Sequence, residues 1–200
     1  MAKANWINAN PAQGSGDANV NVSSNTPHSG RKVRTTILTW EAANVPDVVR
    51  TFNQSGKPEY VDIDASAASA KAGKVVTISG VSNSEKLTFS LGTGDLDISL
   101  PSSYTANSVT TANGANISGD PGASTEYNFS IKITVPANES TTPQTRQIIV
   151  EDSAGHRDIC LLTLAAGDAY ITIPDTVFEL DWQGTPITVE VKSNTTWTIS

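Results

Sequence analysis

An internal repeat restricts the fold of this chain more than any other feature of its sequence. The matched segments are Tyr60-Val-Asp-Ile-Asp, Gly73-Lys-Val-Val-Thr-Ile, Ser82-Asn83 and Leu87-Thr-Phe-Ser against Tyr170-Ile-Thr-Ile-Pro, Gly184-Thr-Pro-Ile-Thr-Val, Ser193-Asn194 and Trp197-Thr-Ile-Ser. The offset between the two copies is 110 or 111 residues along their whole length. A fixed period of this kind indicates that one repeat is one structural unit.

A second pair of segments covers the rest of the chain. Its members are Asn19-Val-Asn-Val, Asn25, Arg34-Thr-Thr-Ile-Leu, Phe52 and Gly56 against Ile131-Lys-Ile-Thr-Val, Asn138, Arg146-Gln-Ile-Ile-Val, Leu162-Thr-Leu and Gly167, with offsets of 110 to 113. We therefore predict one complete module over residues 59–168. Residues 1–58 would be the second half of such a module, and residues 169–200 would be the first half of another.

The hydrophobic pattern predicts an all-β protein. Apolar residues alternate with polar ones over 128–135 and over 185–192, which is typical of strands that bury one face and expose the other. Ser, Thr and Asn make up 22, 24 and 15 of the 200 residues, and these types compete with helical hydrogen bonding. Residues 46–52 have a helix-like pattern, but their counterpart over 157–164 is apolar and compatible with a strand, so we predict a strand there. Seven short strands in roughly 110 residues are typical of an immunoglobulin-like β-sandwich.

Several motifs, in order, resemble those of the BACON domain family. The matching stretches are Asn5-Trp6-Ile7-Asn8-Ala9-Asn10-Pro11-Ala-Gln-Gly14-Ser-Gly16, Asn25, Arg34-Thr-Thr-Ile-Leu, Phe52-Asn-Gln54-Ser-Gly56 and Ser193-Asn194-Thr-Thr-Trp197. The resemblance implies that Trp6, Trp197, Arg34 and Arg146 occupy core positions of the family. The middle module departs from the pattern, because it has Leu87 or Phe89 where Trp is usual, an insertion over 102–119, and Ala-Ala-Gly167 at its end.

The family consists of all-β, immunoglobulin-like modules from gut Bacteroidetes. Its members often accompany glycoside hydrolases or surface proteins and have a proposed role in binding carbohydrate or mucin. They also occur in virion proteins of the crAss-like phages that infect these bacteria. The residues that follow Met1 lack the apolar segment of a secretory signal, which favours the phage setting. We therefore expect a virion protein made in the host cytoplasm; the alternative location is the bacterial surface or periplasm, after removal of a signal.

The two half modules have three explanations. The chain is a fragment of a longer protein, or its terminal halves pair within one chain as a permuted domain, or the last half completes the first half of a neighbouring subunit. The third arrangement is a head-to-tail contact that generates rings or filaments. A half sandwich without a partner would expose edge strands and an apolar face.

The composition argues against several function classes. A net charge of −7 disfavours nucleic acid as a partner, and no apolar run reaches the length of a membrane span. No nucleophile motif is present, and His28 and His156 both fall in predicted turns. We expect no enzyme activity, no cofactor and no metal. Cys160 lies in an apolar strand and is expected to be buried rather than reactive.

Pairs of carboxylates also have a structural interpretation. They occur at Asp62/Asp64, Asp95/Asp97 and Glu151/Asp152. Two carboxylates two residues apart on a strand share one face, so they could bind calcium or act as an acid pair. Charged strand edges that discourage aggregation are the favoured interpretation.

Three aromatic residues are candidates for contact with a glycan or a protein partner. Trp182 lies in a predicted turn, Trp40 ends a predicted strand, and Tyr104 lies in the polar stretch 102–119, which is predicted to be a long loop like 136–145. Exposed aromatic faces bind sugar rings. Packing in a core or an interface is the competing interpretation for Trp40 and Trp182.

The expected function is that of a non-enzymatic structural protein of a phage particle. It would attach to the capsid or form part of a head fibre, contact capsid or other virion proteins, self-associate and display a surface that holds mucin glycans. The alternative is a carbohydrate-binding or adhesion module of a Bacteroidetes surface protein.

Overall fold

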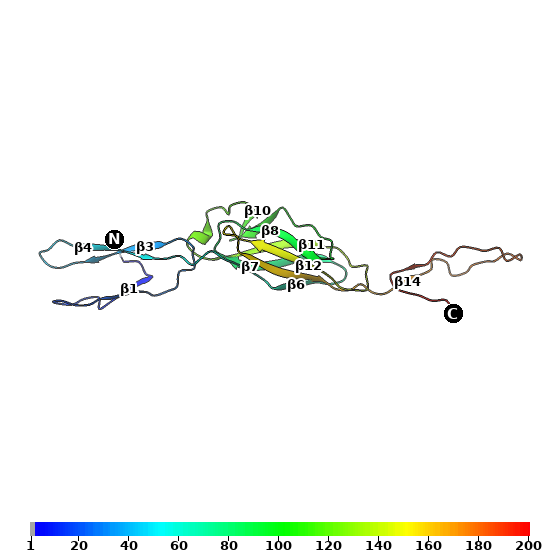
Figure 1. The fold of residues 1–200 in the computed structure, drawn as a ribbon, viewed down its shortest axis with the longest axis horizontal. Coiled ribbons are helices and arrows are strands. Elements are labelled where there is room, and N and C mark those ends of the chain that lie inside the picture. The colour runs from blue at the N-terminus through cyan, green and yellow to red at the C-terminus, as the bar shows by residue number, and fades with distance from the viewer. Residues whose placement is uncertain (1–2) are drawn as a thin grey trace.

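The computed structural model describes residues 3–200 as an elongated all-β molecule (Figure 1). A central two-sheet body lies between an N-terminal part made of two hairpins and a C-terminal part that runs out as a long, nearly strand-free loop. The all-β prediction is therefore confirmed. The only helical element in the described residues is the single 3₁₀ turn η1 (Pro121–Ala123).

The first large sheet of the central body has five strands in the order β10-β9-β11-β7-β5. Their bounds are β5 (Val61–Ile63), β7 (Lys74–Ser82), β9 (Ser103–Ala106), β10 (Val109–Ala112) and β11 (Tyr127–Val135). The longest pairing is antiparallel and runs from Tyr127 opposite Ser82 to Val135 opposite Lys74.

The second sheet has four strands in the order β6-β13-β12-β8. Their bounds are β6 (Ser66–Ser69), β8 (Thr88–Gly94), β12 (Gln144–Glu151) and β13 (Arg157–Leu164). Strand β6 runs parallel to β13, and the other neighbours are antiparallel. A bulge between Arg146 and Ile148 shifts the register of β12 against β8.

The core lies between these two sheets and follows the alternation of the sequence. On β11 the residues Phe129, Ile131, Ile133 and Val135 are buried while their neighbours are partly or fully exposed, as predicted. The ring of Phe89 on β8 lies 5.0 Å from the ring of Tyr104. Aromatic and β-branched side chains on two inner faces are the usual filling of a β-sandwich.

The insertion over 102–119 is not the long loop that we predict from its polarity. It contains β9 and β10, which form a hairpin at the edge of the five-stranded sheet. Asn107 and Ser108 at its tip have φ angles of 47° and 66°. Positive φ at both central residues is the geometry of a two-residue hairpin turn whose twist suits the flanking strands.

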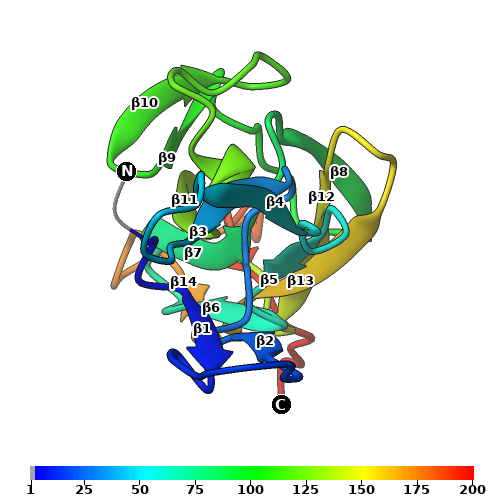
Figure 2. The same ribbon diagram turned by 90° about the vertical axis from the view of Figure 1, so that its left-hand side faces the viewer.

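The N-terminal part consists of two separate hairpins that extend from one end of the body (Figures 1 and 2). Strand β1 (Ile7–Asn10) pairs with β2 (Asn21–Ser24), and β3 (Arg34–Trp40) pairs with β4 (Val48–Gln54), both antiparallel. The prediction of a strand rather than a helix at 46–52 is confirmed. Since neither hairpin joins the larger sheets, their apolar sides lack the second layer that the central body has.

The C-terminal part has much less regular structure than its sequence predicts. Only β14 (Ile171–Thr172) and β15 (Lys192–Ser193) pair. The strand expected over 185–192 is wrong for all but its final residue, and Ile187 and Val189 are exposed. A strand needs a neighbour for its backbone hydrogen bonds, and residues 185–191 have none in this chain.

The two terminal parts lie at opposite ends of the molecule, with the central sheets between them (Figure 1). Pairing of 1–58 with 169–200 within one chain is therefore not what the structure contains. The reason is geometric, because the central body separates the two segments. Completion by further sequence and completion by another subunit are both compatible with this placement.

Candidate assembly surfaces

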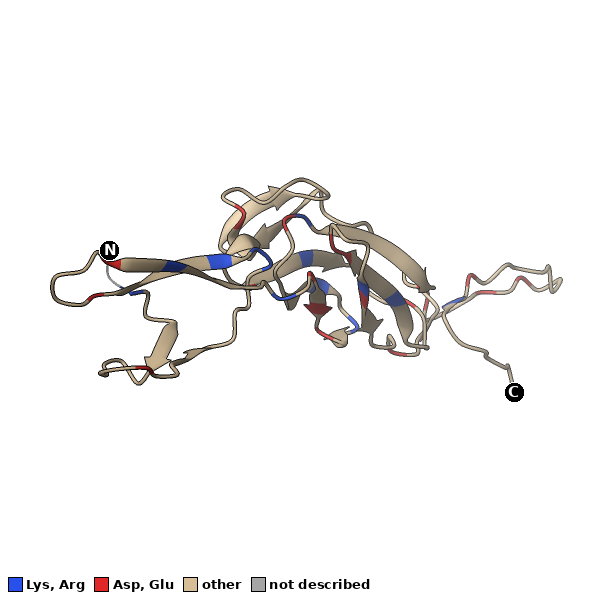
Figure 3. Cartoon of the chain, turned by 60° about the vertical axis from the view of Figure 1, so that its left-hand side comes forward, with Lys and Arg blue, Asp and Glu red and all other residues tan. Residues whose placement is uncertain are grey.

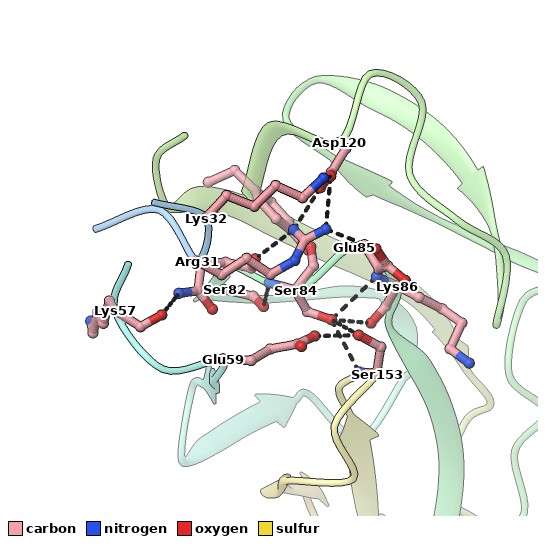
Figure 4. A network of polar contacts seen from close by, with 12 residues as sticks. Arg31, Lys32, Lys57, Glu59, Ser82, Ser84, Glu85, Lys86, Asp120 and Ser153 are labelled. Atoms are coloured by element: carbon pink, nitrogen blue, oxygen red, sulfur yellow. Dashed lines mark hydrogen bonds and ion pairs between the residues drawn. The ribbon is translucent and has the colours of Figure 1, made fainter. Parts of the chain in front are cut away.

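The N-terminal part is attached to the central body through Arg31, whose side chain is only 11% exposed. Its guanidinium donates to both carboxylate oxygens of Asp120, at 2.5 and 2.7 Å, and to Oε2 of Glu85 at 2.8 Å (Figure 4). The same group donates to the carbonyl of Asn83 at 3.1 Å. The hydrogen bonds from Arg31 lower the pKa of Asp120 below its usual value. A forked, part-buried pair of this kind fixes orientation as well as adding energy.

Asn83 organises the crossing between the N-terminal part and the first strand of the body. This residue is fully buried, and its Nδ2 lies within hydrogen-bonding distance of the carbonyls of Ser29, Lys57 and Pro58, at 3.2, 3.3 and 3.2 Å. Its Oδ1 accepts from the amide of Tyr60 at 3.0 Å. One side chain thus joins three backbone segments.

The crossing from the body to the C-terminal part is built in the same way, one repeat later. Nδ2 of Asn194 donates to the carbonyls of Glu139 and Asp168 at 2.8 and 2.9 Å, and its Oδ1 accepts from the amide of Tyr170 at 2.9 Å. Ser193 Oγ donates to the Tyr170 carbonyl at 2.8 Å, just as Ser82 Oγ donates to that of Tyr60 at 2.7 Å. The repeat read from the sequence is therefore also a repeat of hydrogen bonds.

The N-terminal part contains a groove of about 880 Å³ between its two hairpins. Val20, Ile37, Leu38 and Trp40 are among its lining residues, but the charged Lys3, Glu41 and Asp47 also line it and most of its exposed lining is polar. Trp40 is 39% exposed, and its ring centroid lies 6.2 Å from that of Phe52. The position of Trp40 at the groove is compatible with contact with a partner and with packing in the core of an incomplete sandwich.

Arg34 and Trp6 stabilise the wall of this groove. The guanidinium carbon of Arg34 lies 4.6 Å from the centre of the half-buried Trp6 ring. Its Nε donates to Gln54 Oε1 at 2.8 Å, and Nη2 donates to the Thr26 carbonyl at 2.8 Å. Both residues thus connect the hairpins to each other. A cation over an indole face contributes about 0.5–1 kcal/mol at such a site.

Arg146 has a comparable role inside the central body. Its Nε donates to the carbonyl of Leu96 at 2.8 Å, and Nη1 donates to that of Gly92 at 3.2 Å. These bonds satisfy backbone groups beside the bulge between β12 and β8. Arg146 therefore bonds the backbone of β8 and of the residues that follow it, and it does not contribute to the apolar core.

Tyr104 does not offer the exposed ring that we predict. It is 3% exposed, its ring packs against Phe89, and its hydroxyl accepts from the amide of Leu87 at 3.3 Å. Burial raises the pKa of this phenol. The reason is the β9–β10 hairpin, which places Tyr104 on the inner face of the sheet. The signal that could have revealed it is the alternation on either side of Asn107-Ser108.

The C-terminal part presents most of its apolar residues to solvent. Trp182, in the turn where we predict it, is 91% exposed, and Trp197 is 46% exposed. Other exposed apolar residues here are Ile171, Ile173, Val177, Leu180, Ile187, Val189 and Ile199. Large exposed apolar surfaces are often sites of interaction. Trp197 is thus not packed in a core within the single chain.

Catalytic chemistry has little support in the residues that are described. Nδ1 of His156 lies 2.8 Å from Oδ2 of Asp152, but this buried carboxylate also accepts from the amides of Ala154 and His156 and so closes the β12–β13 turn. Cys160 is buried, as predicted, and burial raises the pKa of its thiol to about 11. Such a thiol stays protonated and unreactive near neutral pH.

One carboxylate of each predicted pair accepts hydrogen bonds from backbone amides. Asp64 accepts from the amide of Ser79 at 2.8 Å, and Asp95 accepts from that of Thr145 at 2.7 Å, which lowers the pKa of Asp95. Among residues 3–200 no group of three or more His, Cys, Asp or Glu could hold a metal ion. Within the same range, no helix has the length and apolar character that crossing a membrane requires.

The geometry thus points to two surfaces, the groove of residues 3–58 and the apolar face of residues 169–200, as the candidate functional regions. A search with models of known protein families finds no match to the chain, and a search of curated proteins finds none either.

Proposed function

We propose that this protein is a non-enzymatic structural subunit of a phage virion, as a capsid decoration or head-fibre protein built from immunoglobulin-like, BACON-like modules. The observation that carries the proposal is the presence of two uncovered surfaces at opposite ends of an elongated body, a groove in the N-terminal part and an apolar face on the C-terminal part. A subunit with one binding surface at each end can join two other subunits at once. Such an arrangement suits assembly better than catalysis.

The phage setting draws its support from the resemblance of the motifs around Trp6, Arg34 and Trp197 to BACON domains, which occur in virion proteins. Rigid connections also favour a structural role, because Arg31 and Asn83 hold the first crossing with a dense set of hydrogen bonds. A fibre or decoration protein must hold its modules at fixed angles under load.

Mass spectrometry of purified virions tests this proposal. We expect peptides of this chain in particles of the phage that carries the gene, at a copy number comparable with that of a capsid or fibre protein. Particles that are infectious and contain none of these peptides would contradict it. Electron microscopy of particles labelled with an antibody to residues 59–168 would then place the protein on the head or the tail.

A second function, binding of carbohydrate, is favoured by one specific observation, the nearly complete exposure of the Trp182 ring. An indole face with polar neighbours such as Gln183 and Thr185 can stack on a sugar ring. A glycan array with mucin oligosaccharides tests it. Binding that Trp182→Ala abolishes, and that a Val109→Ala control retains, would support this function, and no binding by the folded protein would contradict it.

A further inference from the structure

We propose that the C-terminal part of one copy completes the sandwich of the N-terminal part of a second copy, so that the chains join head to tail. The inference deepens the proposed structural function by naming the partner, and it rests on that function. Each terminal part contains the strands that the other lacks. Residues 169–200 correspond to the segment that holds β5, β6, β7 and the start of β8, and residues 3–58 correspond to the segment that holds β11, β12 and β13.

The central body shows how two such halves fit together. Its first half contributes β7, which pairs with β11, and β8, which pairs with β12, while β6 runs parallel to β13. These three pairings are the only way in which the halves of the module share sheets. The same three pairings between copies would give strand partners to residues 185–191 and to the exposed edges of the N-terminal hairpins.

Positions of the central body and their counterparts in the C-terminal part differ in burial, as completion by a second copy requires. Ile78 is fully buried in the central body, whereas its counterpart Val189 is 38% exposed. The same contrast separates Ile63 from Ile173, Val76 from Ile187, Leu87 from Trp197 and Phe89 from Ile199. The C-terminal part therefore retains the apolar residues of a sandwich half without the layer that covers them. The groove between the N-terminal hairpins belongs to the other half of the module, and Ile37 and Leu38 of β3 line it beside polar residues.

The C-terminal part is acidic, with one Lys and four Asp or Glu over residues 169–200 (Figure 3). Residues 3–58 contain six Lys or Arg and three Asp or Glu, but Arg31, Lys32 and Lys57 pair with acids of the central body. The three remaining basic residues balance the three acids. Charge therefore permits contact between unlike ends, whereas two acidic C-terminal parts repel each other. A contact between unlike ends that does not close on itself produces a chain of subunits.

Two positions that form an ion pair in the central body both carry different residue types in the terminal parts. In the central body Lys71 forms an ion pair with Asp168, across the two halves of the module. The turn after Lys71 is closed by Gly73 N to Ala70 O at 2.8 Å and recurs as Gly184 N to Asp181 O at 3.1 Å. By these equivalences Trp182 takes the place of Lys71.

The partner position changes in the same sense. Asn83 bonds the carbonyls of both Lys57 and Pro58, and Asn194 bonds that of Asp168, so the Lys57-Pro58 stretch stands where the central body has Asp168. The acid of the ion pair is thus absent from the N-terminal part, and Trp182 replaces the lysine. The loss of both members is expected if Trp182 meets Lys57 and Pro58 across copies. It also explains why the Trp182 ring lies in solvent in a single chain.

A backbone contact is expected beside this pair. In the central body the amide of Asn138 donates to the carbonyl of Lys71 at 2.7 Å. Asn138 Nδ2 bonds the carbonyl of Thr142, and His28 Nε2 likewise lies 2.6 Å from the carbonyl of Lys32. These bonds make His28, rather than the Asn25 that the sequence repeat matches with Asn138, its structural counterpart. The amide of His28 should therefore donate to the carbonyl of Trp182 in the neighbouring copy.

The test uses the 200-residue chain and two variants that each block one end. Val189→Asp places a charge on the C-terminal face, and Trp40→Asp places one in the N-terminal groove. We expect the unaltered chain to form a concentration-dependent series of multiples of 21.0 kDa in sedimentation velocity. Each variant alone should be limited to monomers, and an equal mixture of the two should form dimers, since one intact surface of each kind remains. Val75→Asp, at an exposed position on the central body, is the matched control and should assemble like the unaltered chain.

Cysteine cross-linking places the contact. A mixture of Trp182→Cys and Pro58→Cys chains should give, on mild oxidation, a disulfide-linked peptide that contains both positions, while a mixture of Val109→Cys and Pro58→Cys chains should give at least tenfold less. Circular dichroism of each variant establishes that its sheets remain folded. An unaltered chain that stays monomeric at high concentration, or blocked variants that do not form dimers when mixed, would overturn the inference. These results are independent of the virion analysis, so a monomeric chain found in virions would contradict the head-to-tail contact and leave the structural function in place.

Discussion

Loss of Arg31 should detach the N-terminal part from the central body without unfolding that body. Arg31 forms a forked pair with Asp120, a weaker pair with the more exposed Glu85, and a bond to the carbonyl of the buried Asn83. We assign about 2 kcal/mol to the part-buried pair with Asp120, about 0.5 kcal/mol to the solvent-screened pair with Glu85 and about 1 kcal/mol to the carbonyl. Arg31→Ala should therefore cost about 3.5 kcal/mol in attachment of the N-terminal part.

Tryptophan fluorescence separates the two units, because residues 59–168 contain no Trp while Trp6 and Trp40 lie in the N-terminal part. In a background where Trp182 and Trp197 are Phe, urea unfolding followed by fluorescence reports the N-terminal part alone. A small unit has an m-value of about 1 kcal/mol/M, so Arg31→Ala should lower the midpoint by roughly 3–4 M or remove the transition.

A control variant and the dependence on pH test this prediction further. Lys32→Ala is the matched control, since Lys32 contacts the same Asp120 from a mostly exposed position and should cost less than about 0.5 kcal/mol. The folded-state pKa of Asp120 is lowered, so its contribution is present above the ordinary pKa of about 3.8 and is lost as the pH falls through the lower folded value. The difference between the unaltered chain and Arg31→Ala should shrink in that acidic range. Parallel shifts of the tryptophan signal and of the circular dichroism of the central sheets would refute the reasoning.

Three other substitutions or reactions have expected outcomes. Gly94→Ala should destabilise the central body by at least about 2 kcal/mol in thermal unfolding, because φ is 147° there and a Cβ would lie 2.2 Å from the carbonyl oxygen of Thr145; an unchanged melting temperature would contradict this. Asn83→Ala should cost about 2–3 kcal/mol in chemical denaturation and Asn194→Ala, at a half-buried position, less than about 1 kcal/mol, so equal losses would argue against the difference in burial. Cys160 should react with a thiol reagent at pH 8 only when the protein unfolds, at a rate that follows unfolding, and rapid labelling of the native chain would show that the thiol is accessible.

The local pattern of the sequence predicts the parts of the fold whose neighbours are present. Alternation over 128–135 correctly identifies the buried face of β11, and comparison of the two repeats correctly assigns β4 as a strand despite its helix-like sequence. The burial of Cys160 follows from the apolar residues around it. In each case the strand has partners in the same chain, so local preference and tertiary structure agree.

The sequence predictions fail where the pairing of strands depends on residues that are distant in the sequence. The polar residues around Tyr104 favour a loop by composition, but the turn at Asn107 and Ser108 lets them form a hairpin that docks on β11. The sequence over 185–192 alternates as clearly as that of β11, yet it has no neighbour and remains without strand pairing. The candidate contact residues divide in the same way, since the exposure of Trp182 follows from its turn while the burial of Tyr104 depends on a hairpin.

The shared geometry at Asn83 and Asn194 has a consequence for any assembly of these chains. Both joints use the same Asn and Ser side chains to fix the backbone where one module ends and the next begins. Where these shared hydrogen bonds recur, they favour the same rotation and translation from one module to the next. Successive modules would then follow a regular screw, with a pitch and a curvature determined by these few hydrogen bonds rather than by the broad apolar faces.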